Sequence, residues 1–511
     1  MNTEQRSPGS AGRRRTERRR AAIHHAAYLT RSFPPLRVAS EEGLSLIEHN
    51  ADTILQEIGM EFRGDAEVLS ILERAGADVR GERVRFERGM CRSIIQASAP
   101  AEFIQHARNP ERSIRLGGMN TALAPAGGAP FVHDLDRGRR YASLEDLNNL
   151  ISLVQTIPCL HHAGGFLVAP MDKDLSERHL HAMESQFLFS DKPVVCAGAG
   201  TTVAEDCVRM SALVFGEEFL ARNCVLYGAV NTNSPLVLDA TMMEGMKVLA
   251  RANQAVTVSP YILSGAMGPV GLAGALAQQL AEAMAGLALY QLLRPGAPCT
   301  MGTFIGAVSM QTGGPAFGTP ESMLGSATAV ELARRLGVPS NNAGGAVTAA
   351  RIPDAQAAYE SALTLHTNLL SGANIIWHCA GWLEGGLTTG YEKLMLDADL
   401  CSSLEVLTRG IDFSTESQAM DAIREVEPGG HFLAATHTMK HFETLLWRPS
   451  IWDSKTYEQW SDSVHRTPPS VRMRYGSGAS PRRTSPAIDA EVREALRITV
   501  RVGTEIAATP V

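Results

Sequence analysis

Two stretches of this 511-residue chain carry the side chains best suited to chemistry. The first is Pro298–Pro320, in which an apolar run, Cys299–Ile305, leads into a loop that contains four glycines, Gln311 and Phe317. Glycine lets a ligand approach the backbone, and the helix predicted to begin at Pro320 offers free N–H groups. Loops longer than about a dozen residues are uncommon without a function, so we predict a site here.

The second stretch is Ile376–Leu387, which contains His378, Trp382 and Glu384. A tryptophan at the end of a strand serves either as core or as a face that binds a cation, and the spacing leaves both open. Arg351 follows an earlier predicted strand and is suited to bind a carboxylate.

The residues that could bind a metal ion do not form a ligand pattern. His161 and His162 are adjacent in a predicted strand, so their side chains point to opposite faces. A zinc centre built from His378, His437 and Cys299 is the remaining option, and we expect no metal site at this place. A P-loop, a G-x-S-x-G turn and an H-E-x-x-H helix are absent from the sequence.

The elements that must position these residues follow a regular rhythm after Ser143, where short apolar strands alternate with helices of ten to twenty residues. This alternation predicts an α/β fold with a parallel sheet closed into a (β/α)8 TIM-type barrel, and an open doubly wound sheet is the runner-up. Against the runner-up, no Gly-x-Gly-x-x-Gly follows the first strand. The predicted strands are 159–168, 194–199, 225–230, 255–263, 299–305, 340–347, 374–380 and 432–436.

Four regions are predicted along the chain. Residues 1–30 are a disordered basic tail, and residues 31–142 form an N-terminal α+β cap that includes a hairpin at 79–86 and antiparallel strands at 114–124 and 130–141. Residues 143–450 form the barrel. Residues 451–511 form a C-terminal wrap that ends in a helix.

Composition narrows the class of protein. Residues 1–20 carry seven Arg and two Glu, whereas the whole chain has a formal net charge of −7, so the body is acidic and a nucleic-acid partner is not expected. Eight scattered cysteines without a CxxC pair predict reduced thiols and a cytoplasmic protein. We expect no membrane-spanning helix, because apolar runs of about 18 residues are absent.

Four segments carry a resemblance to known proteins: Val338–Glu360, Ala380-Gly-Trp-Leu-Glu-Gly-Gly-Leu-Thr, Gly430–Phe442 and the start at Leu44–Gly59. Together they resemble the trimethylamine methyltransferase family, and the similarity runs from about residue 35 to the C-terminus. The resemblance implies a (β/α)8 barrel that demethylates a small methylated amine. It also implies that the methyl group passes to the cobalt of cobalamin carried by a separate corrinoid protein, with no tightly bound cofactor in this chain.

The resemblance places Val347 at the family's pyrrolysine site, where it is the only candidate for a catalytic position. Because valine stands there, and Ala349-Ala350-Arg351 replaces a more polar run, the chain looks like a non-pyrrolysine member. Such relatives are associated with quaternary amines such as glycine betaine, proline betaine and carnitine. A quaternary amine leaves as a neutral amine and needs no covalent activation.

We therefore predict one pocket at a broad mouth, and a homo-oligomeric protein without membrane partners. Trp382 or Phe317 would hold the ammonium, and Arg351 or His378 would hold a carboxylate; Glu384 is either part of the site or a partner for a loop N–H. A barrel lyase or aldolase that uses a lysine, and a non-catalytic betaine-binding barrel, are the alternatives. The residues predicted to line the pocket are Gln311, Phe317, Arg351, His378, Trp382 and Glu384.

Overall fold

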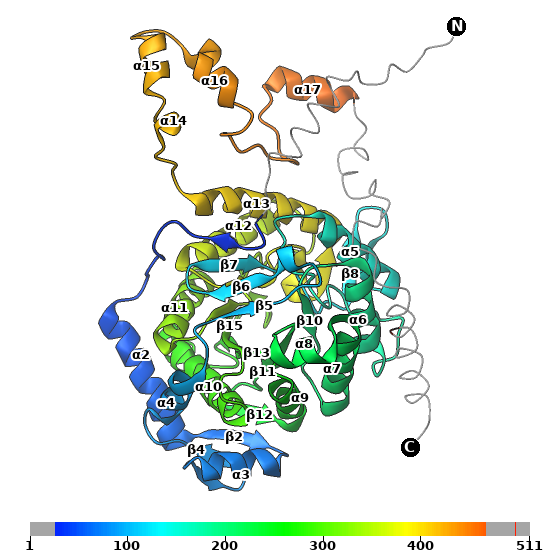
Figure 1. Ribbon diagram of the computed structural model, residues 1–511, viewed down its shortest axis with the longest axis vertical. Coiled ribbons are helices and arrows are strands. Elements are labelled where there is room, and N and C mark those ends of the chain that lie inside the picture. The colour runs from blue at the N-terminus through cyan, green and yellow to red at the C-terminus, as the bar shows by residue number, and fades with distance from the viewer. Residues whose placement is uncertain (1–25, 467–495, 497–511) are drawn as a thin grey trace.

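The computed structural model describes residues 26–466 and residue 496. Figure 1 shows a curled central sheet with helices around it, a small α+β region at one side and an arm that extends from helix α13. Residues 1–25 of the predicted basic tail lie outside the described residues, whereas Leu29–Thr30 form strand β1, which pairs with β7 (Asn120–Leu123). Of the predicted C-terminal helix, only Leu496 is described; it is helical and buried in the core.

The N-terminal region forms from local signals in the sequence. Ser40 caps helix α2 (Glu41–Thr53) by accepting a hydrogen bond from the Gly43 N–H, which satisfies a free donor of the first turn. The predicted hairpin is confirmed as β3 (Asp78–Arg80) and β4 (Arg83–Arg85). The other elements are a π-helix (Ile54–Ile58), β2 (Met60–Arg63), α3 (Ala66–Arg74), α4 (Met90–Ser98), β5 (Glu102–Gln105), a 3-10 turn (Pro110–Arg112), β6 (Ile114–Gly117), β8 (Phe131–Asp134) and β9 (Gly138–Tyr141).

The central sheet has the order β1-β7-β18-β17-β15-β13-β11-β10, and its pairs from β7 to β10 are parallel. Six of the predicted strands lie here, often shorter than predicted. The other strands of this sheet are β10 (Val194–Cys196), β11 (Leu226–Asn231), β13 (Ala255–Ser259), β14 (Tyr261–Ser264), β15 (Cys299–Val308), β16 (Pro315–Ala316), β17 (Ser340–Asn342) and β18 (Ile375–Ile376). Strand β12 (Val237–Asp239) pairs with β2, and β19 (Trp382–Leu383) and β20 (Thr388–Gly390) form a separate sheet with β8 and β9.

The first predicted strand, 159–168, is not a regular strand, but its residues contact both ends of the parallel sheet. The His161 N–H donates to the Leu123 carbonyl at the end of β7 (2.9 Å). The Ala163 N–H donates to the carbonyl of Pro193, directly before β10 (3.0 Å). The segment 161–163 therefore lies between the two strands that end the parallel part of the sheet.

The predicted strand at 432–436 is wrong. Residues Phe432–Ala434 form a 3-10 turn and Thr436–His441 form helix α16, both on the arm. The predicted antiparallel pairing of residues 114–124 is also wrong in part. Although β6 pairs antiparallel with β5, β7 pairs parallel with β18, with Ala122 opposite Ile375, and so contributes a strand to the central sheet.

The helices begin where the sequence places their caps. Ser143 and Asp146 form a capping box at the start of α5 (Leu144–Thr156), and Asp354 caps α12 (Ala355–Ser371). The remaining helices around the sheet are α6 (Arg178–Phe189), α7 (Thr201–Phe215), α8 (Glu217–Arg222), α9 (Ala240–Arg251), α10 (Leu272–Leu293), α11 (Pro320–Leu336) and α13 (Tyr391–Arg409).

Helix α10 is the central helix of the core and the only described helix that is long and apolar enough to cross a membrane. Of its most apolar 18-residue window, 83% is buried inside the protein, where it packs against α2, α4 and β15. Its only buried carboxylate, Glu282, accepts hydrogen bonds from Thr232, Ser234 and the Leu236 N–H. These features are those of a core helix.

The arm is formed by short helices that follow α13. In residues 411–450, only Ala422 and Ala435 are buried. Figure 1 shows the arm standing away from the central sheet. Its helices are α14 (Thr415–Gln418), α15 (Met420–Val426), α16 (Thr436–His441) and α17 (Tyr457–Arg466).

Candidate active site

A cluster of aromatic rings lies at the carboxyl ends of strands β15 and β18. The ring of Phe304, in β15, stacks on that of Phe317, with centroids 5.5 Å apart. Trp382, in β19, meets both rings edge to face, at 5.8 Å from Phe304 and 6.0 Å from Phe317. His378 follows β18, and its ring lies 4.2 Å from that of Trp382. We call these four residues the aromatic cluster.

Tyr261 extends the cluster on its other side. Its ring centroid lies 4.9 Å from that of Phe304, and burial raises the pKa of its hydroxyl to about 12. The phenol is therefore neutral at physiological pH. The cluster and its extension offer ring faces and no charged side chain, which is the surface that attracts an organic cation.

The loop after Trp382 adopts a conformation that makes room for the rings. Gly386 has φ of +96°, and a Cβ atom there would lie 2.5 Å from the indole of Trp382. A Cβ atom at Gly385 would lie 3.3 Å from the ring of Phe317. Glycine is thus needed at Gly386 for both the backbone and the ring contact.

His378 is held as a neutral imidazole. Its backbone has φ of +58°, and its Nδ1 accepts a hydrogen bond from the Gly127 N–H at 3.2 Å. Burial among the rings lowers the pKa of His378 to about 3. Because Nδ1 is the acceptor, the proton lies on Nε2, which is a donor. A neutral ring does not repel a bound cation.

Val347 is almost completely buried and belongs to the same buried apolar group as Phe317 and Trp382. Its loop is fixed by helix α12, where the Glu360 carboxylate accepts hydrogen bonds from the Thr348 hydroxyl and the Ala349 N–H. Valine has no group that forms a covalent adduct, so the side chain at this position shapes the pocket.

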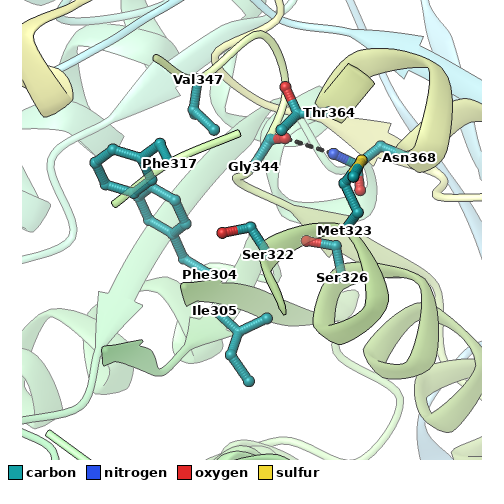
Figure 2. A pocket seen from close by; sticks show the side chains of 10 residues that line it. All are labelled: Phe304, Ile305, Phe317, Ser322, Met323, Ser326, Gly344, Val347, Thr364 and Asn368. Atoms are coloured by element: carbon teal, nitrogen blue, oxygen red, sulfur yellow. Dashed lines mark hydrogen bonds between the residues drawn. The ribbon is translucent and has the colours of Figure 1, made fainter. Parts of the chain in front are cut away.

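Below these rings a narrow pocket lies between β15, α11 and α12 (Figure 2). Figure 2 shows Phe304 and Phe317 facing each other at one side and the hydroxyls of Ser322 and Ser326 at the other, with the Asn368 amide bonded to the Gly344 carbonyl. The residues that line the pocket are Phe304, Ile305, Phe317, Ser322, Met323, Ser326, Gly344, Val347, Thr364 and Asn368.

Glu384 is held by partners outside the cluster. Its carboxylate accepts from Arg139 Nε and from the Thr388 hydroxyl, both at 2.7 Å, and its own N–H donates to the Ala350 carbonyl. Burial opposes ionisation of Glu384, but the hydrogen bonds from Thr388 and Arg139 outweigh it and lower its pKa. The carboxylate of Glu384 therefore binds side chains of β9 and β20 rather than the loop N–H of the structural alternative, and its backbone N–H joins the loop after β19 to the loop after β17.

The structure brings together only part of the predicted site. Phe317, His378 and Trp382 belong to the aromatic cluster, and Val347 belongs to the same buried apolar group as Phe317 and Trp382. Gln311, at the tip of the loop between β15 and β16, and Arg351, after β17, are exposed. Neither residue belongs to the cluster or lines the pocket described above.

Sequence reasoning missed Phe304, whose ring contacts all three other members of the cluster, as that of Trp382 does, and also Tyr261. The signal was available, because Phe304 is the one aromatic residue in the strand that leads into the glycine-rich loop. Tyr261 is not among the residues predicted to line the pocket.

The histidines and cysteine considered for a metal centre contact different neighbours. His161 Nδ1 accepts from the Leu123 N–H, and His162 contacts Gln105, with its ring tilted against that of Trp377. Cys299 lies in the core beside Gln291, and His437 lies on the arm. These four side chains therefore contact different parts of the protein.

Three lysines within residues 143–450, Lys192, Lys247 and Lys393, each have partners outside the aromatic cluster. Burial lowers the pKa of Lys192 to about 7, and its ammonium donates to three carbonyls at the end of α5. Lys247 pairs with Asp65 and Glu67, and Lys393 pairs with Asp397. None of the three belongs to the aromatic cluster, so these contacts do not favour a Schiff-base mechanism.

Comparison with known proteins identifies the relatives of this chain. The family model described as trimethylamine methyltransferase matches residues 6–502. A glycine betaine methyltransferase of Desulfitobacterium hafniense is 34% identical over 90% of this chain and 96% of its own length. A trimethylamine methyltransferase of the same species is 29% identical over 82% and 84%, respectively. A proline betaine:corrinoid methyltransferase of Eubacterium limosum is 25% identical over 83% and 89%.

Proposed function

The chain belongs to the trimethylamine methyltransferase family, and from this premise we propose that it moves a methyl group from a betaine-type quaternary amine to the cobalt of a corrinoid on a partner protein. The aromatic cluster of Phe304, Phe317, His378 and Trp382 is the observation that carries the proposal. It supplies a desolvated aromatic surface at the ends of the parallel strands, where α/β proteins carry their sites.

The scaffold we propose is a closed (β/α)8 barrel. The seven strands in the order β7-β18-β17-β15-β13-β11-β10 are paired in parallel. The backbone hydrogen bonds from His161 to the end of β7 and from Ala163 to the residue before β10 support the segment 161–163 as the eighth member of the barrel. Closure would place the loops that follow β15, β17 and β18 around one opening. Phe317, Val347, His378 and Trp382 lie in the segments that follow these strands, and Phe304 lies in β15 itself.

The ammonium would lie against the rings of Phe304, Phe317 and Trp382. A cation–π contact in a desolvated place contributes about 2 kcal/mol, or roughly thirtyfold in affinity. His378 is neutral, so it adds ring surface without repelling the charge. No carboxylate belongs to the cluster, so the positive charge would be bound by ring faces rather than by an ion pair.

The carboxylate of a betaine would be bound by N–H donors near the same rings. Trp382 Nε1 is buried and has no hydrogen-bond partner among the described residues. A buried donor without a partner costs free energy, and a substrate carboxylate would remove that cost. The Nε2–H of His378 would be a second donor, and the exposed guanidinium of Arg351 a third.

Valine at position 347 fits a substrate that already carries a good leaving group. A reduced corrinoid supplies the nucleophile when the partner is docked, so the chain needs only to bind the amine, orient one N-methyl group and exclude water. The product amine of a quaternary substrate leaves neutral and needs no proton at the moment of transfer. The buried Val347 side chain excludes water beside the rings.

The test is a panel of amines with free cob(I)alamin, with conversion to methylcobalamin followed by absorbance. We expect conversion with glycine betaine, proline betaine or carnitine, and much slower conversion with trimethylamine. Conversion with trimethylamine alone would overturn the substrate class.

A non-catalytic betaine-binding protein is the second candidate, and calorimetry separates it from an enzyme. Saturable binding of a betaine, together with no conversion by the free cofactor or by the cognate corrinoid protein, would favour the binding protein.

A further inference from the structure

Three side chains with metal-ligating atoms converge on the arm, away from the residues of the aromatic cluster. They are Glu416, in α14, and His437 and His441, in α16. One ligand atom from each lies within 4.8 Å of the other two. In the part of the chain that the structure describes, they form the one such group of His, Cys, Asp or Glu.

The sequence explains this convergence. His437 and His441 are four residues apart in one helix, so their rings lie on the same face, with centroids 4.6 Å apart. Helix α14 presents Glu416 to that face: its Oε1 lies 2.5 Å from His441 Nε2, and its backbone carbonyl lies 2.9 Å from His437 Nε2. Two imidazoles and a carboxylate therefore already share one small volume.

We propose that Glu416, His437 and His441 bind a divalent transition-metal ion, with Zn²⁺ as the preferred class. Imidazole and carboxylate are ordinary zinc ligands, and two His with one Glu leave a fourth position of the tetrahedron for water. The site binds the ion by three side chains from two helices, so the ion would join α14 to α16.

A metal ion that joins α14 to α16 would stabilise the arm. Only Ala422 and Ala435 are buried in residues 411–450, so apolar packing within the arm contributes little to holding α14 against α16. Small units that bury little apolar surface are commonly stabilised by a metal ion or a disulfide. The described cysteines lie in the body of the protein, all buried.

The competing explanation is a surface network of hydrogen bonds. Lys440 Nζ lies 2.8 Å from the same Glu416 oxygen that contacts His441, and its ammonium provides the positive charge that a metal ion would supply. The two explanations make opposite predictions for Lys440→Met. Removal of the ammonium frees the carboxylate for a metal ion, whereas a plain hydrogen-bond network loses a member and gains no ligand.

The experiment is calorimetric titration of untagged, chelator-washed full chain with Zn²⁺. We expect one ion per chain for the wild type, at least about tenfold weaker binding for H437N/H441N, and binding at least as tight for K440M. His431→Asn is the matched control, because His431 is an exposed histidine of the same arm outside the triad, and it should bind as the wild type does.

A second measurement does not depend on heat signals. Zn²⁺ should slow proteolysis of the arm in the wild type and in the His431→Asn control, and not in H437N/H441N. The proposal is overturned by the absence of saturable binding in the wild type. Equal binding in the wild type and H437N/H441N would overturn it as well.

Discussion

The imidazole of His378 and the indole of Trp382 lie with their ring centroids 4.2 Å apart and their planes at 57°. His378 reaches this position with φ of +58° and with Nδ1 bonded to the Gly127 N–H, which leaves its Nε2–H and the unpartnered Nε1–H of Trp382 as the donors near the cluster. The pair thus combines a face for a cation with donors for an anion, the two parts of a betaine.

The first prediction concerns Trp382. Trp382→Leu removes one aromatic face and a donor, so affinity for glycine betaine should fall by roughly thirtyfold, whereas Trp382→Phe should recover the part due to the ring. Isothermal calorimetry measures both. Trp447→Leu, at an exposed tryptophan of the arm, is the control. Wild-type affinity in Trp382→Leu would place the ammonium elsewhere.

The second prediction concerns the charge of the ligand. 3,3-Dimethylbutanoate has the shape of glycine betaine but carbon in place of the ammonium nitrogen. If ring faces bind the positive charge, this analogue should bind roughly thirtyfold more weakly than glycine betaine. Competition calorimetry gives the ratio. Equal affinity would show that the pocket selects shape alone.

The third prediction concerns pH and His378. The native pKa of about 3 lies below the ordinary value of 6.5, so the unfolded state binds the proton more strongly and stability falls as pH drops from 6.5 toward 3. His378→Asn removes this term, so between pH 7 and pH 5 the variant should lose about 2 kcal/mol less stability than the wild type.

Urea denaturation at the two pH values measures this difference. Burial also lowers the pKa of His162 to about 3. Because His162 is present in both proteins, it causes the same loss of stability in each and does not affect the comparison. An identical pH dependence of the wild type and His378→Asn would mean that the pKa of His378 is the same in the native and unfolded states.

The fourth prediction concerns a buried ion pair behind the site. Lys393 Nζ contacts the Asp397 carboxylate and the Ser361 hydroxyl, and Asp397 accepts from the Gly381 N–H, next to Trp382. Burial raises the pKa of Asp397, although Lys393 opposes this. Lys393→Met leaves the carboxylate without its cation and should cost about 3–5 kcal/mol of stability.

The double variant K393M/D397L should cost less than K393M alone, because no buried charge is left unpaired. Arg222→Met removes an exposed pair with Glu218 of the same i,i+4 spacing and should cost no more than about 1 kcal/mol. Thermal melting compares the three variants. A K393M melting temperature equal to that of Arg222→Met would refute the importance of the buried pair.

Helix positions could be predicted because their signals are local. The hydroxyl of Ser143 and the carboxylate of Asp354 accept hydrogen bonds from N–H groups three residues later, and a short window of sequence contains both partners. The hairpin at 78–85 follows from its central glycine in the same way. The predicted alternation of strands and helices therefore survives in the structure.

The errors arise where pairing depends on distant residues. Strand β7 is a four-residue segment whose parallel partner, Ile375, lies about 250 residues further along the chain, and no local feature shows this pairing. Phe432 and Leu433 have the apolar character of a strand, but both are exposed on the arm. Phe304 was missed because an aromatic residue in a strand is ordinarily read as core.

The most direct test of the central claim follows the methyl group itself. The protein is incubated with glycine betaine labelled with ¹³C in its N-methyl groups and with cob(I)alamin, and the products are identified by NMR. We predict dimethylglycine and ¹³C-methylcobalamin in equal amounts, and no labelled product when the protein is omitted. Unchanged glycine betaine, in the presence of both the free cofactor and the cognate corrinoid protein, would contradict the account.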